Sequence, residues 1–515
     1  MNRLTKNLLM LLFSPAMLYV AGCTNLDEEV YDKVVADEFG VNEKQINAII
    51  APIYNSLQGF FPGAPWALAE ASSDMAVVPT RKGGDWWGGG QWKEIETHAW
   101  TPNTAYINGA YNNITRGIST CNQIYYTIEN SKAEIPNRER ILAEIRAVRA
   151  FWYYVMVDYF GNVPVVTDFN DTELPTNTPR KDVYAFVVNE LNAVKDLLRD
   201  DITVSSYGKM TKGAAYTLLA KLYLNAAVWN PEGGTKWQEC ADACDMVMGM
   251  DYVLEPDWRT NFAVNNEISR EFIFPAVFTR NGGGNNNIAQ QSLHYLAPVA
   301  LGLNISCWNG ISVMPDYYRA FDEADKRREW SFLTGPLTNP ATGDVLITAH
   351  GRPLIHHVDI TKVYSIDADG WGQVEQEDGG RCIKWELESG LSAPAQENDF
   401  GIFRLADVYL MKAEALVRLG IENDEATRLV NEVRKRAFDD PAKLFNSVTL
   451  DDVYRERRFE FAWEGMTRQD QIRFGTFLKA IPGWKPEKSN PDLLLFPLPQ
   501  NALNANPNLV QNPGY

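Results

Sequence analysis

The sequence contains few cysteines and few histidines, which limits the disulfide and metal chemistry it can support. Six cysteines and five histidines occur among 515 residues. The five cysteines after Cys23 are odd in number and scattered, so they form no disulfide framework. Cys240 and Cys244 lie in a segment expected to be helical, and we interpret them as buried small residues, because a zinc site would need further ligands nearby. None of the histidines has a metal-ligand spacing to another ligand, and we expect no metal site from them.

Positive charge is also scarce. Lysine and arginine number 48 against 66 aspartates and glutamates, which gives a net charge of -18 and a pI near 4.9. A nucleic-acid backbone would be repelled, so no nucleic-acid partner is expected. The sequence lacks a phosphate-binding glycine loop, a G-x-S-x-G elbow and an H-E-x-x-H helix, and nothing in it calls for an enzyme. Spacing alone does not exclude a glycosidase carboxylate pair, because such a pair is defined in space.

The one long apolar run stands at the N-terminus, after Arg3 and Lys6. The run Leu8–Val20 is too short to span a bilayer and predicts a secretory signal peptide over residues 1–22. It ends in V-A-G-C, which resembles a bacterial lipobox, so we expect Cys23 to be acylated and to anchor the chain in a membrane. An ordinary signal peptide with an incidental cysteine is the alternative. The acidic run that follows resembles the surface-export signal of Bacteroidota lipoproteins, and we expect the rest to be soluble and tethered.

Helical periodicity dominates two regions of the chain. The predicted helical segments are 42–54, 111–126, 141–161, 182–200 and 211–227 in the first region, and 403–420 and 424–438 in the second. In both regions alanines occur where two helices must approach closely, as in tetratricopeptide packing, although no strict repeat period survives. We therefore predict a mostly α fold, a tetratricopeptide-like scaffold with an N-terminal helical part at 23–250 and a C-terminal part at 401–515 that completes the same fold.

Residues 251–400 have a different composition. They are rich in glycine, asparagine, proline and aromatic residues, with short strand-like pieces at 271–278 and 343–349. A structureless insertion of this length is uncommon in a compact protein, so we predict an irregular, loop-rich α/β lobe laid over the helical scaffold. The run N-G-G-G-N-N-N at 281–287 is expected to be a flexible loop that could close over a ligand.

A weak calcium signal occurs in the same lobe. Asp367 and Asp369 fall at two ligand positions of a calcium loop that would start at Ser365 and end at Gln376. These two end positions require acidic residues in the motif, and both carry uncharged ones here. The pattern favours a polar turn over a structural calcium site.

Several stretches together resemble the SusD/RagB family of outer-membrane nutrient-binding lipoproteins. The most specific are 456–475 and the C-terminal run 496–515, and the further stretches are 149–166, 207–227, 308–327 and 403–416. The resemblance implies a tetratricopeptide-like scaffold with the ligand site on an irregular lobe, and pairing with a SusC-like TonB-dependent outer-membrane barrel. It also implies that a group of charged residues near the C-terminus joins the last helices by buried ion pairs and caps instead of acting in catalysis. These are Glu460, Glu464, Arg468, Asp470 and Arg473.

The segment G-G-D-W-W-G-G-G-Q-W at 83–92 places three tryptophans and five glycines in ten residues. Glycine is unfavourable inside helices and strands, so the segment predicts a loop, within 81–103, that presents aromatic faces. The resemblance places aromatic ligand-binding residues in a loop at this position. We therefore predict that Trp86, Trp87 and Trp92 stack on sugar rings, with at least one of Trp86 and Trp87 exposed. The alternative is that one or more rings anchor the loop from beneath, which we favour for Trp100.

Polar and aromatic residues beside this loop complete the predicted site. The candidates are Asp74, Arg81, Asp85, Tyr295, Trp308 and Asn309. Amide, carboxylate and guanidinium groups would bond sugar hydroxyls. For Asp74 the alternative is a turn cap, and for Trp308 it is a place in the core.

The sequence thus predicts a lipoprotein of the outer membrane, facing the cell surface, that binds an oligo- or polysaccharide and delivers it to a SusC-like transporter. Binding of peptides or other nutrients by the same lid mechanism is one alternative. A surface glycoside hydrolase and a helical-repeat adaptor without a small ligand are the others. No catalytic residue and no cofactor are predicted, and the identity of the glycan is not encoded in any pattern.

Overall fold

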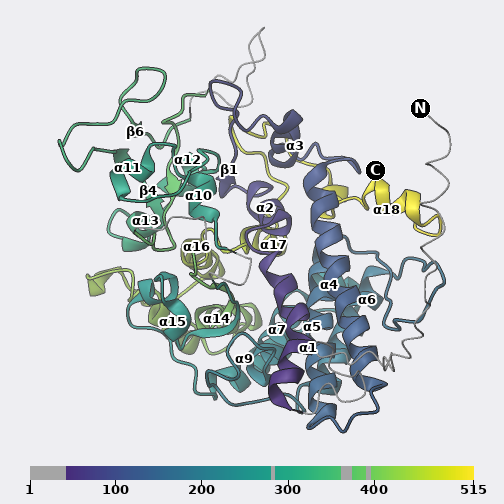
Figure 1. The fold of residues 1–515 in the computed structure, drawn as a ribbon. Coiled ribbons are helices and arrows are strands. Elements are labelled where there is room, and N and C mark those ends of the chain that lie inside the picture. The colour runs from purple at the N-terminus through teal and green to yellow at the C-terminus, as the bar shows by residue number, and fades with distance from the viewer. Residues whose placement is uncertain (1–41, 280–284, 361–373, 390–395) are drawn as a thin grey trace, which may run out of the picture. The chain divides into compact units, whose positions relative to one another are not determined.

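The computed structural model describes residues 42–279, 285–360, 374–389 and 396–515 (Figure 1), all within the unit Gly40–Tyr515. Several expectations lie outside the described residues: the signal peptide at 1–22, the acylation of Cys23, the acidic export run that follows it, calcium at Asp367 and Asp369, and the loop at 281–284. None of the described helices combines the length and the apolar content that a membrane crossing requires.

The first half of the chain is helical. Its helices are α1 (Glu43–Gln58), α2 (Ala64–Ala71), α3 (Gln91–Glu96), α4 (Ala105–Glu129), α5 (Arg138–Tyr159), α6 (Arg180–Val194), α7 (Lys212–Leu224), α8 (Ala226–Trp229) and α9 (Trp237–Met248). The helix α5 packs between α4 and α6, and every residue from Ala147 to Tyr159 is buried. The stretch 150–157 of this helix is apolar on all sides and must lie inside the protein, which explains the central position of its second half.

The last part of the chain is also helical. It contains α14 (Leu405–Leu419), α15 (Asn423–Arg434), α16 (Leu450–Glu460), α17 (Thr467–Arg473) and α18 (Gln500–Ala505). The helix α14 packs against α9, α15 and α16, and α7 packs against α9. The helix α14 is capped by Gly420. The φ of 70° at this glycine lets its N–H donate to the carbonyls of Leu416 and Val417. The helix pairs α7–α9 and α14–α15 form the tetratricopeptide-like scaffold, and the predicted fold class is confirmed.

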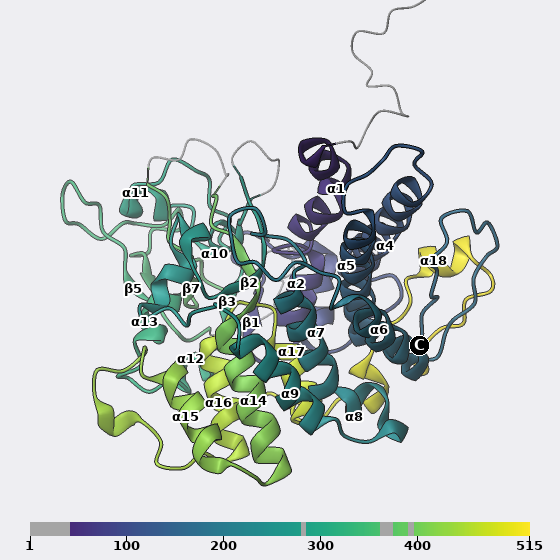
Figure 2. The ribbon, with the colours of Figure 1, turned by 90° about the horizontal axis from the view of Figure 1, so that it is seen from below.

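The irregular lobe lies beside this scaffold and holds short elements. They are β2 (Phe272–Ala276), α10 (Ile288–Ser292), α11 (Ala297–Leu301), β3 (Ser312–Val313), α12 (Pro315–Arg319), α13 (Lys326–Ser331), β4 (Phe332–Leu333), β5 (Gly335–Pro336), β6 (Ile355–His356), β7 (Arg381–Cys382) and β8 (Phe400–Arg404). With β1 (Ala76–Val77), the strands form antiparallel pairs: β1–β3, β2–β8, β4–β7 and β5–β6. Figure 2 shows the lobe on one side and α4–α6 on the other, with α7 and α14 between them.

The strand-like piece predicted at 271–278 is confirmed as β2, whereas the piece at 343–349 contains no strand. It forms only isolated bridges, from Val345 to Thr338 and from Ile347 to Pro353. A turn at Gly343, with a φ of 78°, interrupts the extended backbone. Six one-turn 3-10 helices occur among the described residues: Gly88–Gly90, Pro231–Gly233, Trp258–Phe262, Asn266–Ile268, Pro441–Lys443 and Pro491–Leu494.

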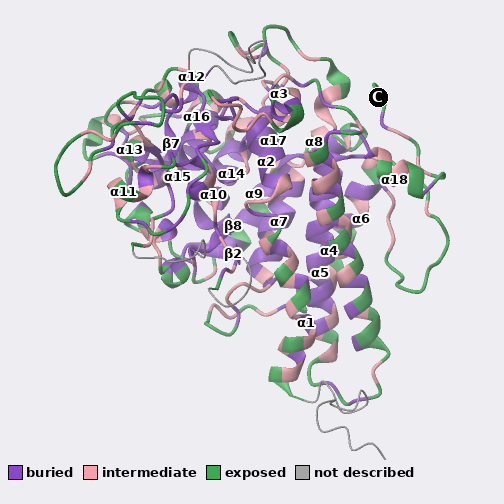
Figure 3. Ribbon diagram, turned by 45° about the horizontal axis from the view of Figure 1, so that its top comes forward, coloured by how far each residue is buried: buried purple, intermediate pink, exposed green. Residues whose placement is uncertain are grey.

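Aromatic residues fill much of the scaffold core, which Figure 3 shows as the buried inner helices. The fully buried tryptophans are Trp66, Trp152, Trp229, Trp258, Trp385 and Trp463. The lobe has a smaller apolar core of its own, built around Leu293 and Leu354. Cys240 and Cys244 are buried on α9 with free thiols, as expected from the sequence.

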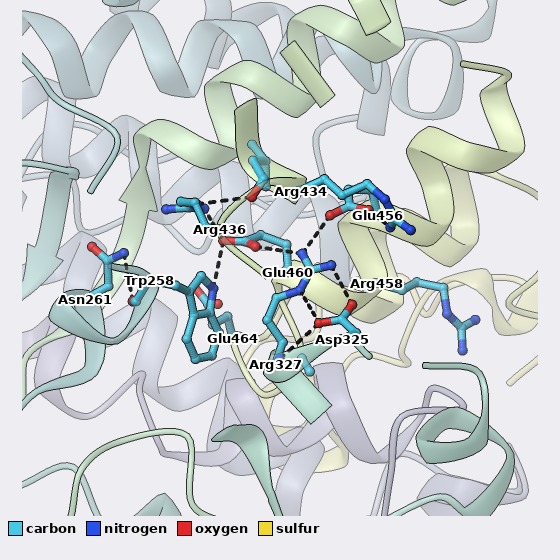
Figure 4. Close-up of polar contacts among 12 residues, drawn as sticks. Trp258, Asn261, Asp325, Arg327, Arg434, Arg436, Glu456, Arg458, Glu460 and Glu464 are labelled. Atoms are coloured by element: carbon cyan, nitrogen blue, oxygen red, sulfur yellow. Dashed lines mark hydrogen bonds and ion pairs between the residues drawn. The ribbon is translucent and has the colours of Figure 1, made fainter. Parts of the chain in front are cut away.

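A network of buried ion pairs joins the lobe to the last helices (Figure 4). Arg327 binds Glu456 and Glu460 at 2.7 and 3.0 Å, and Arg404 binds Glu460 and Glu464 at 2.6 and 2.8 Å. All five side chains are at most 3% exposed. This confirms the predicted role of Glu460 and Glu464 in the scaffold.

The remaining members of the predicted set extend these ion pairs into α17. Arg468 binds Asp158 of α5 at 3.1 Å, and Arg473 binds Glu414 of α14 and Asp470 at 2.7 Å each. The buried ion pairs of these residues confirm the prediction, and they also tie α17 to α5 and α14.

Candidate functional site

The aromatic loop and the irregular lobe meet through the strand pair β1–β3. The strand β1 lies shortly before the aromatic loop, and β3 directly follows the segment 308–311. Pairing of the two strands therefore places loop and segment side by side, although they are more than two hundred residues apart in the sequence. All predicted site residues except Asp74 come together here.

The indole of Trp86 stands at the centre of this site. Its ring centroid lies 6.0 Å from that of Trp92 and 6.5 Å from that of Trp308, and its Nε1 donates a 2.6 Å hydrogen bond to the Trp308 carbonyl. Its backbone has a φ of 61°, in the left-handed region that non-glycine residues adopt only rarely. A Cβ at position 310 would lie 2.2 Å from the indole, so only Gly310 lets the ring rest on the backbone.

Two aromatic rings beside Trp86 face solvent. The side chains of Trp308 and Tyr295 are each 39% exposed, whereas Trp86 is half-buried. Several aromatic rings exposed side by side can mark a binding site, whereas a single exposed ring does not. The alternative that Trp308 belongs to the core is therefore wrong.

The other tryptophans of the loop have supporting positions. Trp92 is 3% exposed and packs against Tyr106 with ring centroids 4.2 Å apart. It therefore anchors the loop from beneath and is not available for contact with a ligand. Trp87 is half-buried and lies over Gly90, where a Cβ would be 3.2 Å from its ring. Because Trp86 is also half-buried, the expectation that at least one of these two rings is exposed was wrong. Trp100 is buried, as predicted, and its Nε1 donates to the Tyr515 hydroxyl at 2.6 Å.

Asp85 and Tyr295 connect the loop to the lobe. The Tyr295 hydroxyl donates to Asp85 Oδ2 at 2.5 Å, and the Asp85 side chain is half-buried. Burial raises the pKa of Tyr295, and the hydrogen bond to Asp85 raises it further, so the phenol keeps its proton. We name Trp86, Trp308, Tyr295 and Asp85 the aromatic cluster. It offers ring faces next to a carboxylate that accepts hydrogen bonds.

Arg81 was expected to contact the ligand, but its side chain is fully buried. Its Nε donates to the Asn309 carbonyl at 2.6 Å, and its two terminal nitrogens bond the Asp378 and Gly310 carbonyls at 2.9 and 3.1 Å and Ser312 Oγ at 2.8 Å. Burial lowers its pKa to about 10, although Asp378 and other acidic neighbours offset part of this effect. Arg81 therefore fixes the backbone beneath the aromatic cluster, and no part of it is left for a ligand.

A second buried arginine, Arg381, was not found from the sequence. It donates to Asn309 Oδ1 at 2.9 Å and to the Asp378 carbonyl at 2.7 Å. Burial, reinforced by the nearby Arg81, lowers its pKa. Asn309 is itself fully buried and has a left-handed φ of 54°. It therefore supports the site and is not available for contact with a ligand. An isolated arginine after two glycines carries no sequence signal for this role.

Asp74 lies outside the aromatic cluster. It follows α2 and accepts a 2.9 Å hydrogen bond from Arg458 of α16, whose guanidinium also lies 4.6 Å from the Tyr317 ring centroid. Its carboxylate thus joins α16 to the turn after α2. This corrects the expectation that Asp74 bonds a sugar, and the ion pair replaces the turn cap that was the alternative.

Two buried histidines lie beneath the site and were also missed. The rings of His294 and His356 are 6.2 Å apart, and His294 lies 5.3 Å from the Tyr295 ring. Burial, followed by the positive charge of Arg381 and Arg81, lowers the pKa of His294 to about 3, and burial likewise lowers that of His356. Both rings are neutral at neutral pH. Within the described parts of the chain, no group of three or more His, Cys, Asp or Glu side chains is arranged to hold a metal ion.

A tetratricopeptide-like scaffold with an irregular lobe is the fold of SusD-superfamily proteins of known structure. The sequence profile of the SusD family matches residues 270–515, and a second profile, described as starch-binding associating with outer membrane, matches residues 26–224. The chain belongs to the SusD family.

Named relatives and solved structures agree with this assignment. The chain is 26% identical to the starch-binding protein SusD of Bacteroides thetaiotaomicron over 82% of its own length and 81% of the relative's. It is 23% identical to the SusD-like protein P2 of Formosa agariphila, over 98% and 99% of the two chains.

Two solved structures share the fold. A laminarin-binding SusD-like protein superposes with a TM-score of 0.73 at 23% identity, covering 92% of this chain and all of that one. Surface glycan-binding protein A of Bacteroides thetaiotaomicron, in complex with laminarihexaose, gives a TM-score of 0.72 at 20% identity, over 91% and 99%. At these identities the likeness establishes the fold alone.

Proposed function

We propose that this chain is a surface lipoprotein of the outer membrane that binds an oligo- or polysaccharide on the aromatic cluster and passes it to a SusC-like TonB-dependent transporter. The observation that carries the proposal is the pair of exposed rings, Trp308 beside Trp86 and Tyr295 bonded to Asp85, above backbone that buried arginines fix. The C–H faces of a sugar stack on such rings, while its hydroxyls donate to a carboxylate such as Asp85. Relatives named for starch and laminarin binding support the choice of a glycan over a peptide.

The experiment that tests this proposal measures glycan binding by the purified mature protein. Wild type should retard in gels that contain one or more polysaccharides, and Trp308→Ala should lose most of that retardation. Tyr126→Ala is a matched control, because Tyr126 is 37% exposed on α4, outside the aromatic cluster. Binding of peptides without binding of any glycan would overturn the glycan assignment.

We also propose that the protein binds without catalysis. Most carboxylates near the lobe–scaffold junction, such as Glu460 and Glu464, are held in ion pairs, which supports a structural role for them. Prolonged incubation with a bound polysaccharide should therefore release no new reducing ends. Release of such ends by wild type, and not by a variant lacking one carboxylate, would support a glycoside hydrolase instead.

The proposed anchor is Cys23, whose acyl chains would supply the apolar area for attachment. Cys23→Ala should fold and bind glycan like wild type but leave the membrane fraction. The measurement is fractionation of cells that lack the transporter, so that the partner cannot retain the protein. A substituted protein that stays in the membrane fraction would refute the anchor.

A further inference from the structure

The charged groups at the aromatic cluster differ in their exposure. The cations beneath it, Arg81 and Arg381, are fully buried and donate to backbone carbonyls, Ser312 and Asn309. A ligand on the rings therefore meets neither guanidinium directly. The carboxylate of Asp85, in contrast, lies between loop and lobe at the rings themselves, where it holds the Tyr295 hydroxyl.

Asp85 has no ion pair among the described residues. Arg81 is close enough to influence it electrostatically but donates its N–H groups elsewhere. A carboxylate without a direct cationic partner keeps its negative charge available to whatever occupies the site. Its oxygens accept hydrogen bonds only, so they suit hydroxyl donors and oppose another anion.

The other charged side chains near the edge of the site neutralise one another. Lys82, which is adjacent to the aromatic loop, binds Glu375 at 3.1 Å. Arg352 contacts Glu377 and lies 3.9 Å from Glu375. These cations are already paired with carboxylates of the lobe, so they offer no free positive charge to an acidic sugar. At the rings themselves the site therefore presents the carboxylate of Asp85, while the positive charges of Arg81 and Arg381 are buried beneath them.

We propose that the aromatic cluster selects neutral glycans and rejects glycans that carry uronate or sulfate groups, with Asp85 as the residue that sets this preference. The inference rests on the proposed function, because it names the chemical class of glycan that the same site takes. Asp85 would act in two ways. It accepts hydrogen bonds from the hydroxyls of a neutral sugar, and it repels a negative charge placed beside the rings.

The test uses a panel of neutral polysaccharides, including starch and laminarin, and acidic ones, including a polyuronate and a sulfated galactan. We expect wild type to bind one or more neutral members and none of the acidic ones. The neutral polymer that binds is then oxidised at its primary hydroxyls to uronates, and a part is converted to the uncharged methyl ester. The uronate form should bind roughly tenfold more weakly or worse, and the methyl ester should recover most of the loss, which separates charge from size.

Variants assign the effect to Asp85. Asp85→Asn keeps an acceptor for the Tyr295 hydroxyl, so it should fold, bind the neutral polymer somewhat more weakly, and bind the uronate and neutral forms within about threefold of each other. Asp200→Asn, which removes an exposed carboxylate between α6 and α7, changes the net charge equally and should leave the wild-type preference intact. Acidic glycans bound as tightly as neutral ones, or an unchanged preference in Asp85→Asn, would overturn the inference. Binding of no polysaccharide at all would instead overturn the proposed function.

Discussion

Arg404 in the scaffold and Arg81 under the aromatic cluster are both fully buried, yet they are held in opposite ways. Arg404 binds the carboxylates of Glu271 and Glu460 at 2.8 and 2.6 Å. Burial alone would lower its pKa, but these and other carboxylates outweigh burial and raise it. Arg81 bonds neutral carbonyls and a hydroxyl, and burial lowers its pKa to about 10. The charge of Arg404 is neutralised by carboxylates, whereas the buried charge of Arg81 is held by uncharged hydrogen-bond acceptors.

This difference separates the two parts of the molecule by what they are built to do. Paired charges of the scaffold lock helices together, and removing one member leaves the rest without partners. A guanidinium that bonds several carbonyls instead fixes irregular backbone, because its planar fork demands one geometry. Backbone held in this way includes Asn309, a left-handed residue.

The largest effect is expected when the scaffold network loses its central carboxylate. Glu460→Gln leaves Arg327, Arg404 and Arg436 with an uncharged partner in a fully buried place. We expect the free energy of unfolding to fall by about 3–5 kcal/mol. Urea denaturation measures this free energy, and Glu425→Gln is the control. Glu425 forms a partly exposed ion pair with Arg428, and such a pair contributes well under about 1 kcal/mol. Equal effects in the two variants would show that burial does not matter here.

A smaller loss of stability, together with a loss of binding, is expected at the site. Arg81→Lys keeps the charge but cannot reach all the carbonyls that the fork bonds. We expect it to cost about 2–3 kcal/mol of stability and to weaken glycan affinity at least about tenfold, since Asn309 and Gly310 are no longer fixed. Arg404→Lys is the comparison: it should destabilise the protein while the folded fraction keeps its affinity. If both lysine variants bind like wild type, Arg81 does not shape the site.

Acid should act on the scaffold through Asp407, which binds Lys221 at 2.5 Å and Arg457 at 2.9 Å. Burial raises the pKa of Asp407, but the two cations outweigh burial and lower it from 3.8 to about 2. Because the pKa of Asp407 is lower in the folded state, its ion pairs stabilise the fold fully above about pH 4. This stabilisation is lost as the pH falls through about 2. The loss should be roughly 2 kcal/mol. Unfolding titrations at several pH values measure it, and Asp407→Asn should flatten the curve over this window.

The sequence predicted the scaffold well because its signals are local. Periodic apolar positions predict α5 and α14, and a glycine at position 420 predicts where α14 ends. The aromatic loop belongs to the same kind of inference, since its glycine and tryptophan content alone marks it. The exposure of Trp308 and Tyr295 was not predicted, because no local pattern reports it.

The supporting residues of the site could not be predicted, because their role depends on contacts between distant segments. Arg81 and Asn309 have the residue types of sugar ligands, yet the pairing of β1 with β3 buries both. Arg381 has no distinguishing neighbours in the sequence and acquires its role only beside Arg81. Asp74 binds Arg458, which lies almost four hundred residues later in the sequence. Burial of polar groups is a property of the fold, and a pattern in one segment does not report it.

A comparison of two tryptophans separates anchoring from ligand contact within the aromatic cluster. Trp308→Ala removes an exposed ring, so affinity should fall by about 1–2 kcal/mol while stability changes by less than about 1 kcal/mol. Trp86→Ala removes a half-buried ring that rests on Gly310, and it should cost about 2–3 kcal/mol of stability as well as affinity. Calorimetric binding and melting of both variants measure this. A stability loss in Trp308→Ala equal to that in Trp86→Ala would contradict the exposed position of Trp308.

The smallest effect is expected from Tyr295→Phe, which keeps the exposed ring and removes only the hydroxyl that donates to Asp85. The stacking face survives, so the loss of affinity should be limited to about 0.5–1.5 kcal/mol, the usual value of one hydrogen bond. Stability should change by no more than about 0.5 kcal/mol, because the side chain is partly exposed. Tyr295→Ala, measured beside it by calorimetry, should lose more because it also removes the ring. If Tyr295→Phe loses as much affinity as Tyr295→Ala, the orientation of Asp85 outweighs stacking at this position. If it loses none, the hydroxyl does not hold Asp85 for the ligand, and the rings alone carry the binding.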